Sequence, residues 1–201
     1  MTVESCFAMP IYRSQFKATR LTAVQNELLR AVETIKQTGG FQKNKDWNEG
    51  THKLSDTSFS RNAIEDYSLW LFKKELELHV IEFLKDIKTP IDRYCKFKVS
   101  TCWITQTNPG EHAHLHTHGS NDLAGVYYIK TDKKDGNFIF MNPLSLLKHS
   151  YLFEHLEDQI EYTPEEGTIV LFPGWLEHGV QTNKSTSERI SISFNINFQR
   201  R

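Results

Sequence analysis

Residues 111–128 read EHAHLHTHGSNDLAGVYY and place four histidines at alternate positions, His112, His114, His116 and His118. Successive side chains of an extended chain point to opposite faces, so residues two apart share a face and can converge on one ion. Imidazole is the commonest protein ligand for divalent transition metals. The stretch therefore predicts two ligands of a metal site from a His-x-His pair. The alternative is a polar loop whose histidines bind nothing.

A third ligand has to come from elsewhere in the chain, and His178 is the best candidate. It lies in FPGWLEHGV, after the strand-like run 168–172. Arg189 follows eleven positions later (189 − 178), and Ser191 is two positions beyond it in a strand-like run. Residues two apart on a strand share a face, and arginine with a hydroxyl group suits the carboxylate of a small diacid. The pattern predicts a metal with an anion site beside it.

Taken together, these motifs resemble the Fe(II)- and 2-oxoglutarate-dependent oxygenases. The shared order is a histidine pair, a strand with paired tyrosines, a distal histidine and then Arg-x-Ser. More closely, HTHGSNDLAGVYYIK, GNFIFMNP and GTIVLFPGWLEHGV with ERISISFNINF are similar to the oxygenases of this type found in marine bacteria and their phages. The resemblance covers about residues 98–198 and does not reach the N-terminal third.

The resemblance implies a dioxygenase that uses Fe(II), 2-oxoglutarate and O2, hydroxylates an unidentified substrate and releases succinate and CO2. It implies that the catalytic metal ligands are His116, His118 and His178. The wider superfamily usually has a carboxylate where His118 stands, so Asp122 and His114 stay open as alternate ligands.

The co-substrate residues implied by the resemblance are Arg189, Ser191 and Tyr128, which would hold the 5-carboxylate of 2-oxoglutarate. Tyr127 precedes Tyr128 directly, and adjacent strand residues point to opposite faces. Only one of the two tyrosines is therefore expected to line the site.

Two rival functions are weighed against the oxygenase. One is a cupin-like metalloenzyme with three histidine ligands that does not use 2-oxoglutarate and would not need Arg189. The other is a non-catalytic jelly-roll binding protein. The intact His178 and the Arg189-Ile190-Ser191 pattern argue against a domain that has lost its catalytic function.

Strand-like runs dominate from Tyr94 onward and are separated by turn clusters such as Asn108-Pro109-Gly110. The runs cover 96–106, 125–130, 137–141, 159–162, 168–172 and 190–198. This spacing is typical of a barrel or jelly roll. We therefore expect a mainly β protein with N-terminal helices, a double-stranded β-helix (jelly roll).

The N-terminal part indicates helices that support the sheet. Leu21, Val24, Leu28, Val32 and Ile35 fall on one helix face, and Gly39-Gly40 ends it. A second helical segment of one or two helices is predicted over 60–88, an edge strand within 1–20 and a polar loop, either a lid or a connector, over 41–56. We expect one domain, 1–201, with mainly helical support in 1–93 and the jelly-roll core in 94–201.

The composition narrows the setting of the protein. Lys+Arg 24 against Asp+Glu 25 gives a formal net charge of −1, which offers no global signal for nucleic acid or an acidic membrane. Cys6, Cys95 and Cys102 lack CxxC spacing and are expected to be reduced thiols. We expect a cytoplasmic protein, or a virus-encoded one acting in the host cytoplasm. Its expected partner is a substrate, either a small molecule or a protein residue, and a homodimer stays open.

Overall fold

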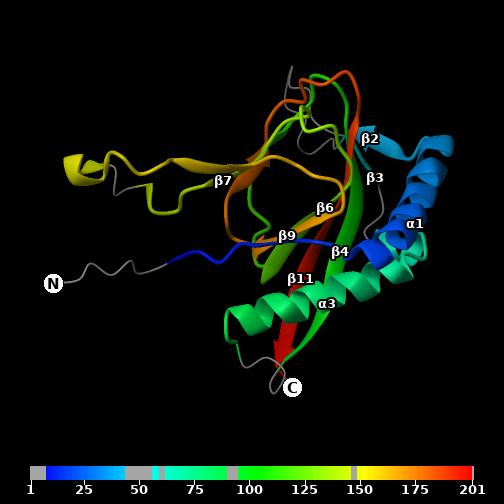
Figure 1. Ribbon diagram of the computed structural model, residues 1–201, viewed down its shortest axis with the longest axis horizontal. Helices are drawn as coiled ribbons and strands as arrows, with labels where there is room; N and C mark the ends of the chain where they lie inside the picture. Colours follow the sequence, from blue (N-terminus) through cyan, green and yellow to red (C-terminus); the bar gives the residue numbers. More distant parts are fainter. Residues whose placement is uncertain (1–7, 44–55, 59–61, 90–94, 146–148, 201) are drawn as a thin grey trace.

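The computed structural model describes residues 8–43, 56–58, 62–89, 95–145 and 149–200, and within them two antiparallel sheets face each other (Figure 1). In spatial order the larger sheet consists of β1 (Tyr12–Gln15), β9 (Thr168–Pro173), β6 (Leu123–Lys130), β11 (Arg189–Arg200), β4 (Cys95–Thr107), β3 (Asp56–Ser58) and β2 (Phe41–Lys43). The smaller sheet consists of β5 (Ala113–His116), β10 (His178–Val180), β7 (Phe138–Met141) and β8 (Gln159–Tyr162). The predicted fold, mainly β with N-terminal helices in a double-stranded β-helix, is confirmed.

Strand β11 shows how the sequence sorts its side chains between the two faces of the larger sheet. Ile190, Ile192, Phe194 and Ile196 are all buried on the face that the helices cover. The alternate positions, which include Arg189, Ser191 and Asn195, therefore face the space between the sheets. A second apolar cluster fills that space, formed by Ala124, Val126, Tyr128, Phe138, Phe140, Val170, Phe172 and Leu176.

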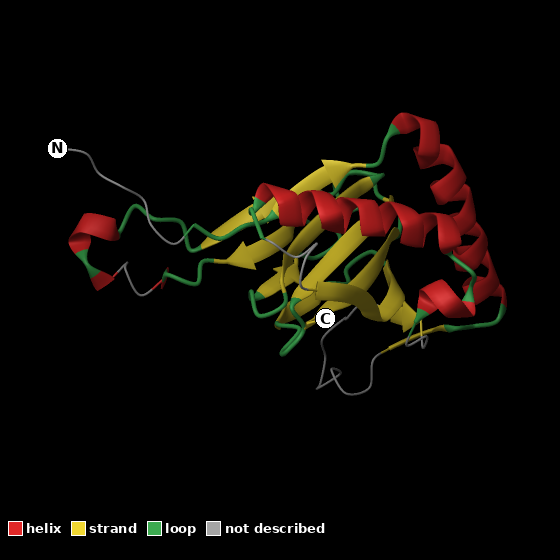
Figure 2. Cartoon of the chain, turned by 90° about the horizontal axis from the view of Figure 1, so that it is seen from below, coloured by secondary structure: helices red, strands yellow, loops and turns green. Residues whose placement is uncertain are grey.

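Two long helices pack on the outer face of the larger sheet, as Figure 2 shows. Helix α1 (Ala18–Gln37) buries Val24, Leu28, Val32 and Ile35, the face predicted from their spacing. It ends before Gly39, whose φ of +66° favours a residue without a side chain. The predicted 60–88 segment contains α2 (Ala63–Asp66) and α3 (Trp70–Asp86). Neither these helices nor any other described helix has the length and apolar character needed to cross a membrane.

The prediction of a loop over 41–56 is wrong at both ends, because it begins with β2 and Asp56 is the first residue of β3. Phe41–Lys43 form β2 and pair with β3, with Phe41 opposite Ser58. Strand β3 in turn pairs with β4 at Thr57 and Thr105. This pairing depends on residues distant in sequence, so the polar composition of the segment did not reveal it. Residues 44–55, where a lid or connector was predicted, lie outside the described residues.

The connection between β7 and β8 is a long hairpin that extends away from both sheets (Figure 1). It carries the 3-10 turn η3 (Tyr151–Phe153), in which Tyr151 is 92% exposed and Leu152 is 77% exposed. At its base the backbone N–H of Asn142 donates to the carbonyl of Asp158 at 2.7 Å, and β7 pairs with β8 from Phe138 to Met141. The hairpin is therefore anchored at its base while its tip is exposed to solvent.

Cys102 is a free thiol buried in the core between β4 and the helices, where burial raises its pKa. A protonated, inaccessible thiol is unreactive. Cys6 and the side chain of Cys95 lie outside the described residues, so their predicted reduced state stays a prediction.

Candidate functional site

Three of the predicted site histidines meet at one end of the smaller sheet. His116 is the last residue of β5, His178 is the first residue of β10, and the two face each other in the antiparallel ladder. His118 follows β5 by two residues. One ring nitrogen of each residue lies within 4.8 Å of the others, and Nε2 of His118 is 3.2 Å from Nε2 of His178. Three convergent imidazole nitrogens are a ligand set for a divalent transition metal.

Backbone carbonyls set the orientation of two of these rings. Nδ1 of His116 donates to the carbonyl of His114 at 2.8 Å, and Nδ1 of His178 donates to that of Leu176 at 2.8 Å. A carbonyl can only accept, so each neutral ring carries its proton on Nδ1. The lone pair of Nε2 is then available to a metal, as in metal sites whose ligands are oriented by partners behind them.

Burial keeps the three rings uncharged. It lowers the pKa of His178 to about 3 and that of His118 to about 4, and lowers that of His116 as well. Repulsion from a protonated neighbour acts in the same direction, from His116 on His118 and His178, and from His114 on His116. At neutral pH the rings are therefore uncharged, and each keeps one nitrogen lone pair that can bind a cation.

The burial of neutral imidazoles predicts an acid-sensitive metal-free protein. Histidine in an unfolded chain has a pKa of about 6.5, well above the folded values for His118 and His178. As the pH falls below about 6.5, the unfolded chain gains protons that the folded protein does not, so the free energy of unfolding decreases. Between pH 6.5 and 5, above the range of ordinary carboxylates, we expect a loss of at least about 1 kcal/mol per pH unit.

Thermal melts of protein treated with EDTA measure this slope. The variant with His118 and His178 both replaced by asparagine is the control. Its stability should lose most of this pH dependence. A melting temperature that does not change across this window would contradict the neutral burial of the rings.

Aromatic side chains surround the histidines. His178 lies between Phe172, with ring centroids 4.6 Å apart, and Phe138, stacked at 5.3 Å. Trp103 of β4 stacks on His118 at 5.8 Å with an interplanar angle of 23°. These rings exclude water from the inner side of the site, which strengthens polar interactions there.

The two alternate ligands, Asp122 and His114, are not part of the three-histidine group. Oδ2 of Asp122 accepts a hydrogen bond from the backbone N–H of Phe198 at 2.7 Å, so this carboxylate is engaged with the end of β11. His114 contributes its carbonyl to His116, and its ring packs edge-on against His112 at 4.9 Å. Among the residues that the structure describes, the three-histidine group is the cluster with metal-binding distances, and it contains neither Asp122 nor His114.

The predicted anion site is also brought together. Tyr128 of β6 lies opposite Ser191 of β11, and burial raises the pKa of Tyr128 while the nearby charge of Arg189 opposes that rise. The hydroxyl of Tyr128 is buried without a hydrogen-bond partner, and so is that of Thr168 on β9. A buried hydroxyl without a partner, close to a buried cation as that of Tyr128 is to Arg189, is an uncommon arrangement that a bound anion would complete.

Arg189 has a structural task besides facing the site. Its side chain is 3% exposed, and Nη1 donates to the carbonyls of Asp135 and Gly136 at 2.9 and 3.0 Å. Nη2 donates to the hydroxyl of Thr107 at 3.0 Å. The guanidinium is therefore fixed in place by the turn before β7 and by β4.

Sequence reasoning missed Thr168 and gave no role to Trp103. Thr168 could have been found from its place two positions before Val170, which shares the inner face with Tyr128. Trp103 required knowledge of the register between β4 and β11, where it pairs with Ser193. No local pattern reveals that pairing.

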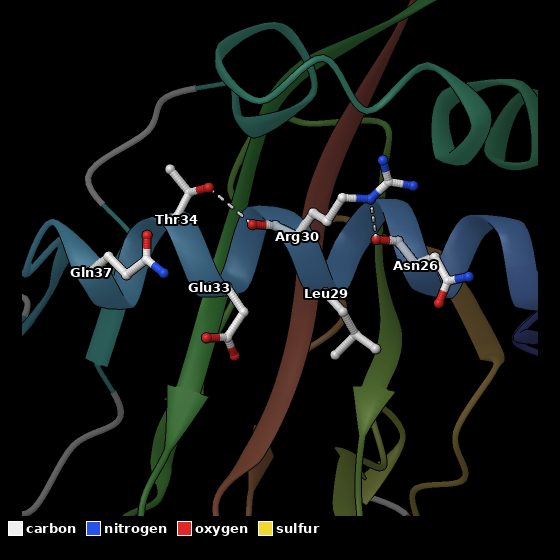
Figure 3. Close-up of a pocket in the computed structure, with 6 residues that line it drawn as sticks. All are labelled: Asn26, Leu29, Arg30, Glu33, Thr34 and Gln37. Carbon is white, nitrogen blue, oxygen red and sulfur yellow. Dashed lines mark hydrogen bonds between the residues drawn. The ribbon is translucent and has the colours of Figure 1, made fainter.

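A separate hollow lies on the outer surface of helix α1, away from the histidines (Figure 3). Two of its side chains bond to the helix itself, since the Thr34 hydroxyl donates to the Arg30 carbonyl and Arg30 Nε donates to the Asn26 carbonyl. It is lined by Asn26, Leu29, Arg30, Glu33, Thr34 and Gln37. No histidine or cysteine is present among these side chains.

Comparison with known proteins agrees with this geometry. Residues 101–195 match the model of a family described as "Putative 2OG-Fe(II) oxygenase". No curated protein sequence matches significantly.

Several solved structures share the fold at low identity. The carbocyclase SnoK from nogalamycin biosynthesis, described as non-heme and alpha ketoglutarate dependent, aligns with a TM-score of 0.66 and 12% identity over 94% of this chain and 79% of its own. A Pseudomonas putida prolyl-4-hydroxylase aligns with 0.61 and 12% over 96% and 94%. HygX from Streptomyces hygroscopicus, with nickel and 2-oxoglutarate bound, aligns with 0.58 and 12% over 94% and 83%.

Proposed function

Because residues 101–195 match the model of the 2OG-Fe(II) oxygenase family, we propose that this chain binds Fe(II) through His116, His118 and His178 and hydroxylates a C–H bond of its substrate at the expense of 2-oxoglutarate and O2. The observation that carries the proposal is the convergence of three neutral imidazoles inside the jelly roll. Their ring nitrogens lie within 4.8 Å of one another, and the inner face of the larger sheet carries Arg189 and the unpartnered hydroxyls of Tyr128 and Thr168.

The donor set fits a divalent metal that needs open positions. Three histidines would supply three ligands and leave further positions to co-substrate and oxidant. Because all three ligands are neutral, a bound divalent ion would keep its full +2 charge, whereas a carboxylate ligand would reduce it to +1. This favours an anionic co-substrate. Zinc accepts the same ligands, so the co-substrate residues carry the distinction from a zinc enzyme.

The inner face of the larger sheet fits the far carboxylate of 2-oxoglutarate. Arg189 provides a buried positive charge, and Tyr128 offers a hydroxyl that no protein group uses. Ser191 lies opposite Tyr128 in the ladder, and Thr168 adds a second unpartnered hydroxyl. Hydrogen bonds to a charged group are the strong ones, so this set would bind a carboxylate firmly.

When bound, Fe(II) with 2-oxoglutarate and O2 supplies the oxidation, which gives succinate, CO2 and a hydroxylated product. The tasks of the chain are to hold, orient and shield. His116 and His178 keep their Nδ1 protons on backbone carbonyls throughout, so the metal-facing nitrogens stay unprotonated. Phe138 and Phe172 exclude water behind His178.

One observation favours a second candidate, a cupin-like three-histidine metalloenzyme that does not use 2-oxoglutarate. Arg189 already donates to the carbonyls of Asp135 and Gly136 and to the Thr107 hydroxyl, which a purely structural arginine would also do. In that case the histidines would serve another reaction, and Arg189 would only stabilise the turn before β7.

One experiment separates the two candidates. Adding Fe(II) and then 2-oxoglutarate to the apo protein without oxygen should produce the metal-to-ligand charge-transfer absorption of a chelated 2-oxo acid. Admitting O2 should then release succinate, which is measured in a screen of prolyl and other peptides, free amino acids, nucleobases and lipid-like molecules. An iron-loaded protein without the absorption band would favour the cupin-like reading. We propose the cytoplasm as the place of action, because the three cysteines lack CxxC spacing and are expected to be reduced thiols.

A further inference from the structure

The hydrogen bonds of Arg189 leave one part of its guanidinium unused. An arginine side chain has five N–H donors. Nη1 donates to the carbonyls of Asp135 and Gly136, and Nη2 donates to the hydroxyl of Thr107. With one N–H for each of these acceptors, the Nε–H and one N–H of Nη2 have no acceptor among the described residues.

Thr107 is the side chain that holds the guanidinium. It lies opposite Arg189 in the ladder between β4 and β11, and it is completely buried. Its carbonyl accepts from Nδ2 of Asn183 at 2.9 Å, and Asn183 is itself buried. The ladder and a buried amide therefore fix the backbone of Thr107, and the Thr107 hydroxyl in turn limits the rotation of Arg189.

We propose that Thr107 is a positioning residue for the co-substrate site. By accepting one N–H of Nη2, it turns Arg189 so that the Nε–H and the second N–H of Nη2 form one edge. This edge binds the far carboxylate of 2-oxoglutarate through two parallel hydrogen bonds. The inference rests on the proposed 2-oxoglutarate site, and it gives the hydrogen bonds of Arg189 a role in recognition.

The chemistry of the surroundings agrees with an anion at this edge. Tyr128 lies opposite Ser191 on the same inner face, and its buried hydroxyl has no partner. A carboxylate has acceptor sites for this hydroxyl as well as for the two N–H donors. The Thr107 hydroxyl accepts from Arg189 without adding negative charge. A carboxylate at position 107 would neutralise the guanidinium and compete with the co-substrate for it.

Two 2-oxo acids separate this role from a general loss of structure. 2-Oxoglutarate and 2-oxovalerate share the end that chelates a metal, but 2-oxovalerate has a methyl group in place of the far carboxylate. In anaerobic titrations of the Fe(II) protein, Thr107→Val should weaken 2-oxoglutarate by about tenfold, roughly the value of one hydrogen bond to a charged group. The affinity for 2-oxovalerate should not change, because that acid does not reach the guanidinium.

Two further variants complete the titration. Thr107→Ser keeps the hydroxyl and should retain the parent affinity for both acids. Thr101→Val is the matched control on the same face of β4. Its hydroxyl also accepts from a side chain of β11, Nδ2 of Asn195 at 2.8 Å. Removing it should leave the affinity for 2-oxoglutarate unchanged.

Arginine Nε–H signals in ¹H–¹⁵N spectra test the same edge without iron or turnover. Glutarate, a diacid of the same length without the 2-oxo group, is added to the metal-free protein. It should shift the Nε–H signal of Arg189, which is assigned by its absence in Arg189→Lys. The shift should require more glutarate in Thr107→Val but not in Thr107→Ser.

Several results would overturn the proposal. One is a parent Arg189 signal that does not respond to glutarate, which decides the question even if Thr107→Val fails to fold. Others are unchanged 2-oxoglutarate affinity in a folded Thr107→Val, equal losses in Thr107→Val and Thr107→Ser, or equal losses for the two acids. If glutarate acts as expected but Fe(II) and 2-oxoglutarate give no charge-transfer band, the oxygenase function alone fails.

Discussion

Replacing His178 with alanine should remove metal binding while the jelly roll stays folded. The side chain is 2% exposed and is the central member of the three-histidine group, in ring contact with both His116 and His118. Loss of a group that merely orients a ligand costs about 10–100-fold, so loss of a ligand itself should weaken binding by more than about 100-fold. Anaerobic titration calorimetry with Fe(II), or with Co(II) as a stand-in, measures this.

The design needs controls because His178 also packs between Phe138 and Phe172. His178→Gln retains more side-chain volume than His178→Ala and leaves a smaller cavity. It should bind metal poorly as well, which would show that a cavity is not the cause of the lost affinity. Asp122→Ala is the matched control near the site, since its carboxylate is engaged with Phe198. It should bind one metal per chain with nearly unchanged affinity. A His178→Ala protein with stoichiometric metal at the parent's affinity would refute the assignment.

Replacing Tyr128 with phenylalanine should weaken 2-oxoglutarate by at least about tenfold without destabilising the apo protein. The hydroxyl has no partner within the protein, so its removal leaves no protein group unsatisfied. A hydrogen bond to a charged group is worth roughly 1.5–3 kcal/mol, and 1.4 kcal/mol is a factor of ten in affinity. Anaerobic titration of the Fe(II) protein, followed by its charge-transfer absorption, gives the dissociation constant.

Tyr127 provides the matched control on the same strand. Its hydroxyl points to the opposite face and donates to Oε1 of Gln25 on α1 at 3.0 Å. Tyr127→Phe should therefore cost roughly 1 kcal/mol of stability and leave 2-oxoglutarate affinity unchanged. Equal affinities in the two variants would mean that the co-substrate does not reach Tyr128.

Arg189 is the more obvious target but gives a less clear experiment. Its alanine variant should also destabilise the fold, because the side chain donates to two carbonyls and a hydroxyl that would lose this donor. A buried group left without a partner costs about 1–3 kcal/mol. Arg189→Lys keeps the charge without the planar fork, so it should lose affinity for 2-oxoglutarate with less damage to the fold.

The sequence allowed prediction of the features that repeat locally. Helix α1 follows from apolar residues at helical spacing, and the two faces of β6 follow from strict alternation, which correctly separates Tyr127 from Tyr128. The His-x-His pair and the distal histidine were identifiable because they are typical metal ligands and lie at the ends of strand-like runs.

Features that depend on register or on distant pairing could not be predicted. Short strands such as β5 and β10 have too few residues to show a period, and β2 forms only because β3 pairs with it. Two of the partners of Arg189 are backbone carbonyls, which cannot be identified from residue types.

The exposed hairpin between β7 and β8 has a consequence for how the chain can be altered. It leaves the smaller sheet at Met141 and returns at Gln159, and these two residues are paired. A change of length beyond that pair is therefore not transmitted to His178, which is anchored by β5 on one side and β7 on the other. Exposed tips with anchored bases are where insertions and proteolytic cuts are best tolerated. A reporter peptide or a fused domain placed at this tip should leave the metal centre assembled.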